Sequence, residues 1–172
     1  IMISVCIATH NGGMFIKEQL LSILMQLEKN DEIIISDDGS TDYTIDEIFS
    51  LRDNRIRVVQ MVHEAKGKKM HYYVTKNFEN ALRYAKGNYV FLSDQDDLWM
   101  PDKVKRCITA LEYCDLVISN LECVDVNLNS LSENIYSENF RFHNFMMRKG
   151  KYYGCAMAFR RNVLEYVLPF PD

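Results

Sequence analysis

Acidic side chains gather in one short stretch, Ser-Asp-Gln-Asp-Asp at positions 93–97, directly after an apolar run. Neighbouring carboxylates repel, and the repulsion raises the pKa of one of them unless a positive charge relieves it. Asp94 and Asp96 are two residues apart, and at a strand end, where the backbone starts to turn, such side chains can converge on one ion. The cluster is therefore a candidate site for a divalent cation.

The chemistry of such a site follows from its oxygen ligands. Hard carboxylate oxygens suit Mg²⁺ or Mn²⁺, which take one or two protein carboxylates and fill the remaining positions with substrate phosphate and water. A diphosphate would complete the site at Asp94 and Asp96, and the metal would neutralise charge that develops on a leaving phosphate. A second interpretation stays open: a solvated acidic turn whose charge favours the N-terminus of the next helix, as we expect for Asp102.

Rigid elements must position these residues, and the sequence alternates β-branched apolar runs with amphipathic segments. We expect strands at residues 2–9, 31–36, 56–61, 88–93, 115–120 and 152–159. We expect helices at residues 14–27, 43–52, 76–85, from 101 onward, and at 160–167. Gln26 is expected on the solvent face of the first helix, and Gly87 is expected to end the third. This alternation predicts the α/β class, with a mostly parallel sheet that is covered by helices on both faces.

Ligands in such sheets bind beyond the carboxyl ends of the strands. Polar clusters at residues 9–13, 36–42 and 93–97 each follow a predicted strand, so we expect them to form one ligand-binding edge. Trp99 is expected to pack beside the last cluster, although stacking on a sugar is the alternative. The segment 128–151 has no clean period, which indicates a long loop, either mobile or facing the substrate.

Composition narrows the class of protein. A chain of 172 residues with 48% hydrophobic and 26% charged residues is typical of a soluble globular domain with its own core. The net charge of -4 argues against a nucleic-acid partner. No run reaches the ~18 apolar residues of a membrane helix. The five scattered cysteines contain no CxxC pair, and we interpret them as buried reduced thiols of a cytoplasmic protein.

Four stretches, taken together, resemble a known family. The sequence VCIATHNG (5–12) is similar to the first strand and turn of the family 2 glycosyltransferases, which have the Rossmann-like GT-A fold. IIISDDGSTD (33–42) resembles their second-strand signature, and FLSDQDDLW (91–99) resembles their metal-binding Asp-x-Asp stretch. GCAMAFRRNVL (154–164) resembles the segment that opens their acceptor-binding half. The resemblance covers nearly the whole chain and is greatest to bacterial rhamnosyltransferase-like members.

The resemblance implies roles for particular residues. Those implied to bind the nucleotide sugar are Ala8, Thr9, Asn11, Asp37, Asp38, Asp94 and Gln95. Those implied to bind the metal, Mn²⁺ or Mg²⁺, are Asp96 and Asp94, with Asp97 orienting the site. Asp38 is the expected partner of the base, ahead of Asp37, and a carboxylate that accepts from a pyrimidine N–H indicates UDP or dTDP. Alternatives stay open: Thr9 and Asn11 as turn formers, and the two aspartates as residues that favour a helix start.

The resemblance also implies an activity, the inverting, metal-dependent transfer of a sugar to a glycan or lipid-linked acceptor in bacterial surface polysaccharide synthesis. It implies a single domain over 1–172, with a nucleotide-sugar-binding part at 1–125 and the start of an acceptor-binding part at 126–172. We expect that acceptor part to be truncated and the general base to lie beyond Asp172. The alternative function is a nucleotide-sugar-binding module without transfer activity.

Membrane association is a separate expectation. The stretch RFHNFMMRK (141–149) mixes aromatic, methionine and basic residues, which fits an ordinary flexible loop or a surface that touches a lipid-linked acceptor at the inner face of the membrane. The oligomeric state is left open.

Overall fold

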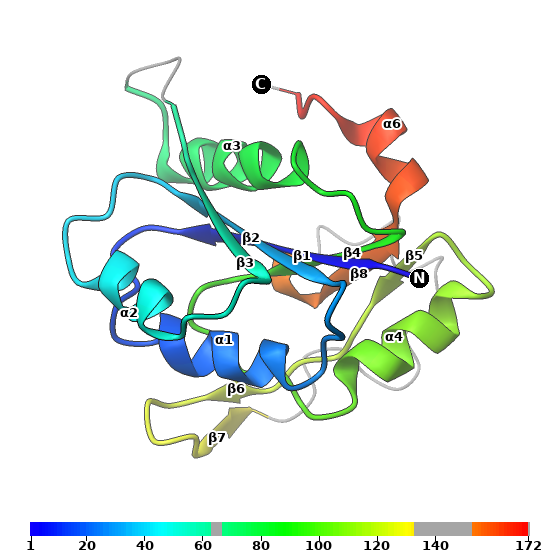
Figure 1. Ribbon diagram of the computed structural model, residues 1–172, viewed down its shortest axis with the longest axis horizontal. Helices are drawn as coiled ribbons and strands as arrows, with labels where there is room; N and C mark the ends of the chain where they lie inside the picture. Colours follow the sequence, from blue (N-terminus) through cyan, green and yellow to red (C-terminus); the bar gives the residue numbers. More distant parts are fainter. Residues whose placement is uncertain (63–66, 133–152, 172) are drawn as a thin grey trace.

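One six-stranded sheet forms the centre of the computed structural model, which describes residues 1–62, 67–132 and 153–171 (Figure 1). The strand order is β3-β2-β1-β4-β8-β5. Its strands are β1 (Ile3–Thr9), β2 (Glu32–Asp37), β3 (Ile56–Gln60), β4 (Tyr89–Ser93), β5 (Leu116–Ile118) and β8 (Met157–Arg160). β1 pairs in parallel with both β2 and β4, and β2 pairs in parallel with β3, whereas β8 runs antiparallel to its neighbours β4 and β5. The predicted mostly parallel sheet is confirmed.

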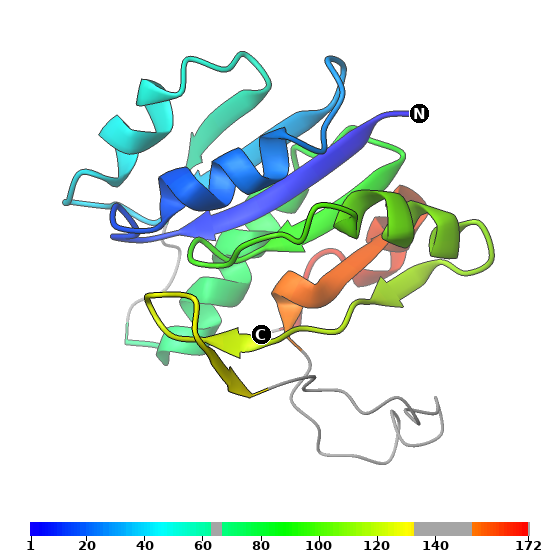
Figure 2. The same ribbon diagram turned by 90° about the horizontal axis from the view of Figure 1, so that it is seen from below.

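Helices cover both faces of this sheet, as predicted (Figures 1 and 2). One face carries α1 (Ile16–Leu24), α2 (Thr44–Ser50) and α4 (Lys103–Leu111), and the other carries α3 (Met70–Leu82) and α6 (Leu164–Val167). Successive strand residues alternate between the two cores, since Ile33 and Ile35 pack in the first and Ile34 in the second. Burial on both faces explains why the strands are continuously apolar.

The register of the sheet brings the predicted polar clusters to one edge. Thr9 at the end of β1 lies opposite Asp37 at the end of β2, and Ile7 lies opposite Ser93 at the end of β4. Because β8 runs in the opposite direction, its first residues reach this same edge. They follow a single 3-10 turn, η1 (Gly154–Ala156). Four segments that are distant in the sequence therefore meet where ligands bind in α/β sheets.

Several local predictions are wrong at their boundaries. The third helix starts at Met70 rather than at residue 76, and the fourth starts at Lys103, two residues after Pro101. The last predicted strand begins at Met157, because the residues before it form the η1 turn. The predicted loop from 128 onward contains β7 (Ser130–Ser132), which pairs with β6 (Cys123–Val124).

Two side-chain predictions also need correction. The third helix ends at Leu82, so Gly87 does not terminate it; this glycine packs against β1, where a Cβ atom would lie 2.5 Å from the Ser4 nitrogen. Among the cysteines, Cys114 and Cys123 are exposed rather than buried. Both lie in short peripheral segments that no helix covers completely.

Candidate functional site

The side chain of Asn11 joins the turn after β1 to the turn after β2. Its Oδ1 accepts bonds from the main-chain N–H groups of Thr41 (2.8 Å) and Asp42 (3.3 Å). The main-chain N–H of Asn11 donates to Ser40 Oγ (2.9 Å). Asn11 has a φ of 50°, a left-handed conformation that asparagine tolerates better than most residues. Asp42 adds a bond from the Gly13 N–H at 3.1 Å. These contacts join the two turns into one hydrogen-bonded unit.

The two aspartates after β2 have different surroundings. Asp37 is buried, and its carboxylate accepts bonds from the Ser40 N–H (3.1 Å), the Ser40 hydroxyl (2.5 Å) and Gln60 Nε2 (3.3 Å). Asp38 is half-buried, and its main-chain N–H donates to the Thr9 carbonyl at 2.9 Å. The carboxylate of Asp37 is thus engaged by Ser40 of its own turn and by Gln60 at the end of β3.

Thr9 and Gln95 join the turn after β1 to the acidic loop 94–97. The Thr9 hydroxyl donates to Gln95 Oε1 at 2.6 Å, and the His10 N–H donates to the same oxygen at 2.9 Å. Thr9 is buried, and its carbonyl also accepts a bond from Asn77 of α3 at 3.2 Å. Ala8, at the end of the same strand, is half-buried. Hydrogen bonds to the acidic loop and to α3 therefore hold Thr9, a predicted nucleotide-binding residue of β1, in place.

The acidic loop meets the η1 turn in a group of possible cation ligands. Within the described residues, ligand atoms of Asp94, Asp97 and Cys155 all lie within 4.8 Å of one another. Burial, and then the charge of Asp97, raise the pKa of Asp94 to about 6. A hydrogen bond with Cys155 opposes this rise, whereas the nearby charge of Asp96 adds to it. A bound cation would relieve the repulsion, so the donor set fits a divalent metal.

This arrangement differs in one respect from the sequence-based prediction. The residues predicted to hold the metal are Asp94 and Asp96, but the compact group contains Asp97 and Cys155 in addition to Asp94. Asp96 is exposed on the same loop. Asp97 is half-buried on this loop.

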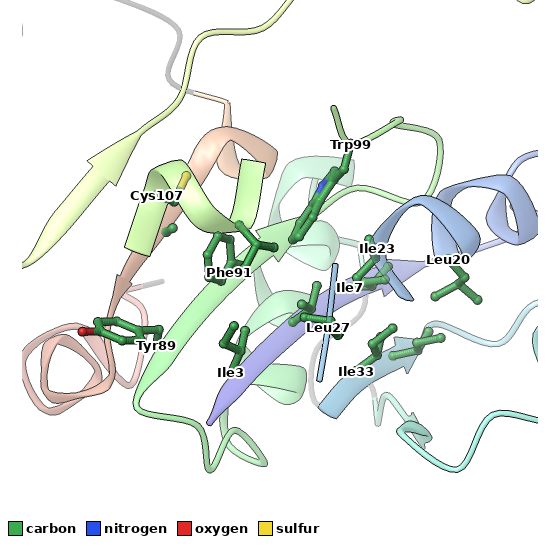
Figure 3. Close-up of a cluster of buried hydrophobic side chains, with 14 of the residues drawn as sticks. Ile3, Ile7, Leu20, Ile23, Leu27, Ile33, Tyr89, Phe91, Trp99 and Cys107 are labelled. Carbon is green, nitrogen blue, oxygen red and sulfur yellow. The ribbon is translucent and has the colours of Figure 1, made fainter. Parts of the chain in front are cut away.

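Trp99 and Lys103 follow the acidic loop, and Trp99 packs into the core beside it. Trp99 is 5% exposed and packs against Phe91 with a ring-centre distance of 5.5 Å, which confirms its predicted packing role (Figure 3). Lys103 Nζ lies 4.5 Å above the Trp99 ring and donates to the Cys155 carbonyl at 2.8 Å. Burial lowers the pKa of Lys103, although its ammonium group faces the acidic loop. A protein cation thus already offsets part of the negative charge.

A polar row along α1 and the turn after it bonds to residues that flank the acidic loop, and sequence reasoning missed it. Gln19 donates to the hydroxyl of Ser93, Ser22 Oγ accepts from the Trp99 N–H at 3.1 Å, and Gln26 Oε1 accepts from the N–H of Val104 at 3.1 Å. The prediction that Gln26 faces solvent is therefore wrong. The spacing of three and four residues between these polar side chains is the signal that places them on one helix face.

Cys155 was also not predicted to belong to the site. Its sequence context indicates an apolar strand, but the antiparallel direction of β8 is what brings it beside Asp94. The stretch 141–149, expected to be a flexible loop or a lipid-contacting surface, and the terminal residue Asp172 lie outside the described residues. Among the helices that the structure describes, none is long and apolar enough to cross a membrane.

Comparison with known proteins decides the family. The sequence model described as "Glycosyl transferase family 2" matches residues 4–168. The chain belongs to this family. This glycosyltransferase chain is 36% identical over 124 residues to the dTDP-rhamnosyl transferase RfbG of Shigella flexneri, and the match covers 70% of the chain and 40% of that protein. It is 37% identical over 112 residues to an Escherichia coli protein, covering 64% of the chain and 41% of that protein. That relative is the UDP-Glc:alpha-D-GlcNAc-diphosphoundecaprenol beta-1,3-glucosyltransferase WfaP.

Solved structures show that the fold is GT-A. The mannosyltransferase PcManGT from Pyrobaculum calidifontis, in complex with GDP-Man and Mn²⁺, superposes with a TM-score of 0.65 at 23% identity. The match covers 98% of this chain and 47% of that one. The chain thus spans about half the length, or less, of the proteins that it matches here.

Proposed function

We propose that this family 2 glycosyltransferase binds a sugar linked to UDP or dTDP at the edge where β1, β2 and β4 end. The observation that carries the proposal is the joining of three polar turns at this edge through Asn11 and Gln95, with the half-buried carboxylate of Asp94 on the third turn. The relatives support these donors, since one is named a dTDP-rhamnosyl transferase and the other uses UDP-Glc.

Recognition of the base falls to Asp38 in this proposal. A carboxylate accepts hydrogen bonds only, and the pyrimidines uracil and thymine present an N–H donor at the same ring position. The engagement of Asp37 by Ser40 and Gln60 supports the choice of Asp38. Ala8, Thr9 and Asn11 would form the wall of the nucleotide pocket.

The cation is Mn²⁺ or Mg²⁺, held by Asp94 and Asp96, with Asp97 orienting the site. The support is the raised pKa of Asp94, which indicates a carboxylate that a second cation would stabilise. The mannosyltransferase with the same fold binds Mn²⁺. When bound, such a metal supplies Lewis-acid neutralisation of the departing diphosphate.

The reaction that we propose is inverting transfer. An acceptor hydroxyl attacks the anomeric carbon while the nucleoside diphosphate leaves from the opposite face, and a general base within hydrogen-bond reach takes the hydroxyl proton. We propose that residues 1–125 bind the donor and that residues 126–172 belong to the acceptor part.

The acceptor that we propose is a glycan or a lipid-linked glycan in bacterial polysaccharide synthesis at the inner face of the membrane. The support is the WfaP relative, whose named acceptor is a GlcNAc-diphosphoundecaprenol. A lipid-linked acceptor places the site of action at a membrane surface without a spanning helix.

Calorimetric titration tests the donor proposal. UDP or dTDP with Mn²⁺ should bind more tightly than ADP or GDP, and Asp38→Asn should weaken pyrimidine binding about tenfold, the cost of about one charged hydrogen bond. The matched variant Asp37→Asn should act mainly on protein stability, because its carboxylate bonds to its own loop. Equal affinity for all four nucleotides would contradict the role of Asp38.

A further inference from the structure

Gln95 lies between the two predicted metal ligands in sequence, yet its side chain points away from them to the turn after β1. Its Oε1 accepts bonds from the Thr9 hydroxyl (2.6 Å) and the His10 N–H (2.9 Å), and its Nε2 donates to the His10 carbonyl (3.3 Å). An amide oxygen has two lone pairs, so both acceptor positions are filled. The side chain is thus engaged with the protein rather than directed at a ligand.

The surroundings of this amide leave it little freedom to move. Gly12 is buried and packs against it so closely that a Cβ atom there would lie 2.5 Å from Gln95 Cδ. The carbonyl of Thr9 is itself held by Asn77 and by the Asp38 N–H, so the turn that receives Gln95 is anchored to α3 and to the turn after β2. Gln95 therefore connects two structured segments that are 85 residues apart in the chain.

We propose that Gln95 is a positioning residue that couples metal binding to nucleotide binding. The inference rests on the proposed function, in which the turn after β1 binds the nucleotide and loop 94–97 binds the metal. Because the Gln95 amide holds the two segments in one arrangement, a ligand that binds either segment in that arrangement also keeps the other in place, so the second ligand meets a preorganised site. By linkage, the factor by which Mn²⁺ tightens UDP binding equals the factor by which UDP tightens Mn²⁺ binding.

This role differs from the donor contact that the family resemblance implies for Gln95. A donor contact would reduce UDP affinity equally with and without metal, because the same bond is lost in both cases. A positioning role instead reduces the ratio of the UDP affinity with Mn²⁺ to the UDP affinity without it. The ratio is therefore the decisive measurement.

The experiment is a set of UDP titrations by calorimetry, with and without Mn²⁺, on the unsubstituted chain and on Gln95→Met. Methionine keeps the length and approximate volume of the side chain but makes none of the three hydrogen bonds. We expect Mn²⁺ to tighten UDP binding in the unsubstituted chain. In Gln95→Met we expect the factor by which Mn²⁺ tightens UDP binding to fall about tenfold, as for the loss of one or two net hydrogen bonds.

Gln26→Met is the matched control. Gln26 has the same side chain, accepts from the Val104 N–H at 3.1 Å and donates to the Ser22 carbonyl at 3.0 Å, but it does not contact the turn after β1. We expect it to lower stability and to leave the Mn²⁺ factor unchanged. A second variant, Gly12→Ala, should displace the Gln95 amide and reduce the factor as Gln95→Met does.

The outcomes separate this inference from the proposed function. If the unsubstituted chain binds UDP with Mn²⁺ dependence but Gln95→Met keeps the full factor, the positioning role is overturned and the donor site stands. An equal loss in Gln26→Met would also overturn it, because general destabilisation would then explain the result. If the unsubstituted chain binds neither UDP nor dTDP, the proposed function fails and this inference fails with it.

Discussion

Replacing Asp94 by asparagine should make the metal-free protein more stable while it removes metal-dependent nucleotide binding. Burial and the charge of Asp97 raise the pKa of Asp94 from 3.8 to about 6, so at neutral pH the folded protein holds an unfavourable carboxylate. Asparagine keeps the shape of the side chain and has no charge to desolvate. The variant therefore removes a cost that the folded state bears only when Asp94 is ionised.

The size of the effect follows from the pKa shift. A shift of about two units corresponds to about 3 kcal/mol, and partial exposure of Asp94 reduces the expected value to about 1–2 kcal/mol. Because the folded-state pKa is the higher one, the folded protein binds more protons than the unfolded chain between about pH 4 and pH 6. Stability of the unsubstituted protein relative to Asp94→Asn should fall as the pH rises through this window and then stay level.

Urea unfolding in the presence of a chelator, at several pH values from about 4 to 7.5, measures this difference. Adding Mn²⁺ and UDP should then stabilise the unsubstituted protein far more than the variant, because binding to the folded state adds to its stability. Asp102→Asn is the control, since Asp102 is exposed and should change stability by less than about 0.5 kcal/mol. A stability difference between protein and variant that does not change with pH would refute the assignment of burial as the cause.

Three further predictions concern the support of the site, and each is read by urea unfolding. Gly87→Ala should destabilise the protein by about 2–3 kcal/mol, because the added Cβ would lie 2.5 Å from the Ser4 nitrogen. Gly39→Ala should destabilise it by only about 1 kcal/mol, because Gly39 has a φ of 69° but no atom near the added Cβ. Equal losses of stability in the two variants would contradict the packing argument. Arg55→Met should cost about 1–3 kcal/mol, since its guanidinium donates to two carbonyls at the end of α1 and pairs with an aspartate; a neutral result would show that water replaces these bonds. Glu79→Gln should lower the free energy of unfolding by about 1–3 kcal/mol at pH 7 and by progressively less below about pH 4.5. Burial opposes the negative charge of Glu79, but its cationic neighbours outweigh burial and lower its pKa. A loss of stability that persists at low pH would exclude the charge as its source.

The fold was largely predictable because the signals for it are local. Continuous apolar runs such as 31–36 indicate strands buried on both faces, and amphipathic segments between them indicate crossover helices. The edge at which residues 9–13, 36–42 and 93–97 meet follows from parallel pairing alone. What local signals could not give is the direction of β8, which depends on the path of the preceding segment, and so Cys155 was not expected beside Asp94.

The roles of polar residues were harder to predict than their location. Asn11, Asp37 and Gln95 all lie at the predicted edge, but the bonds of their side chains go to other groups of the protein. A sequence gives the type of a polar residue and its place at a strand end, whereas the choice between ligand contact and turn support depends on distances of a few tenths of an ångström. Gln26 shows the same limit, since a helical pattern alone cannot show that the N-terminus of α4 contacts it.

Two carboxylates at this edge differ in how their charge is compensated, and the difference supports the proposed ligand site. Asp37 lies deep in the protein at no evident cost, because three donors compensate its charge. Asp94 lies in a similar position at a strand end, but burial and the like charges of Asp97 and Asp96 raise its pKa to about 6. A protein that needed only a stable loop would gain from an uncharged residue there, as the Asp94→Asn prediction states. In the proposed function a positively charged ligand at this position accounts for the carboxylate, and the proposed role of Gln95 couples that ligand to the nucleotide turn.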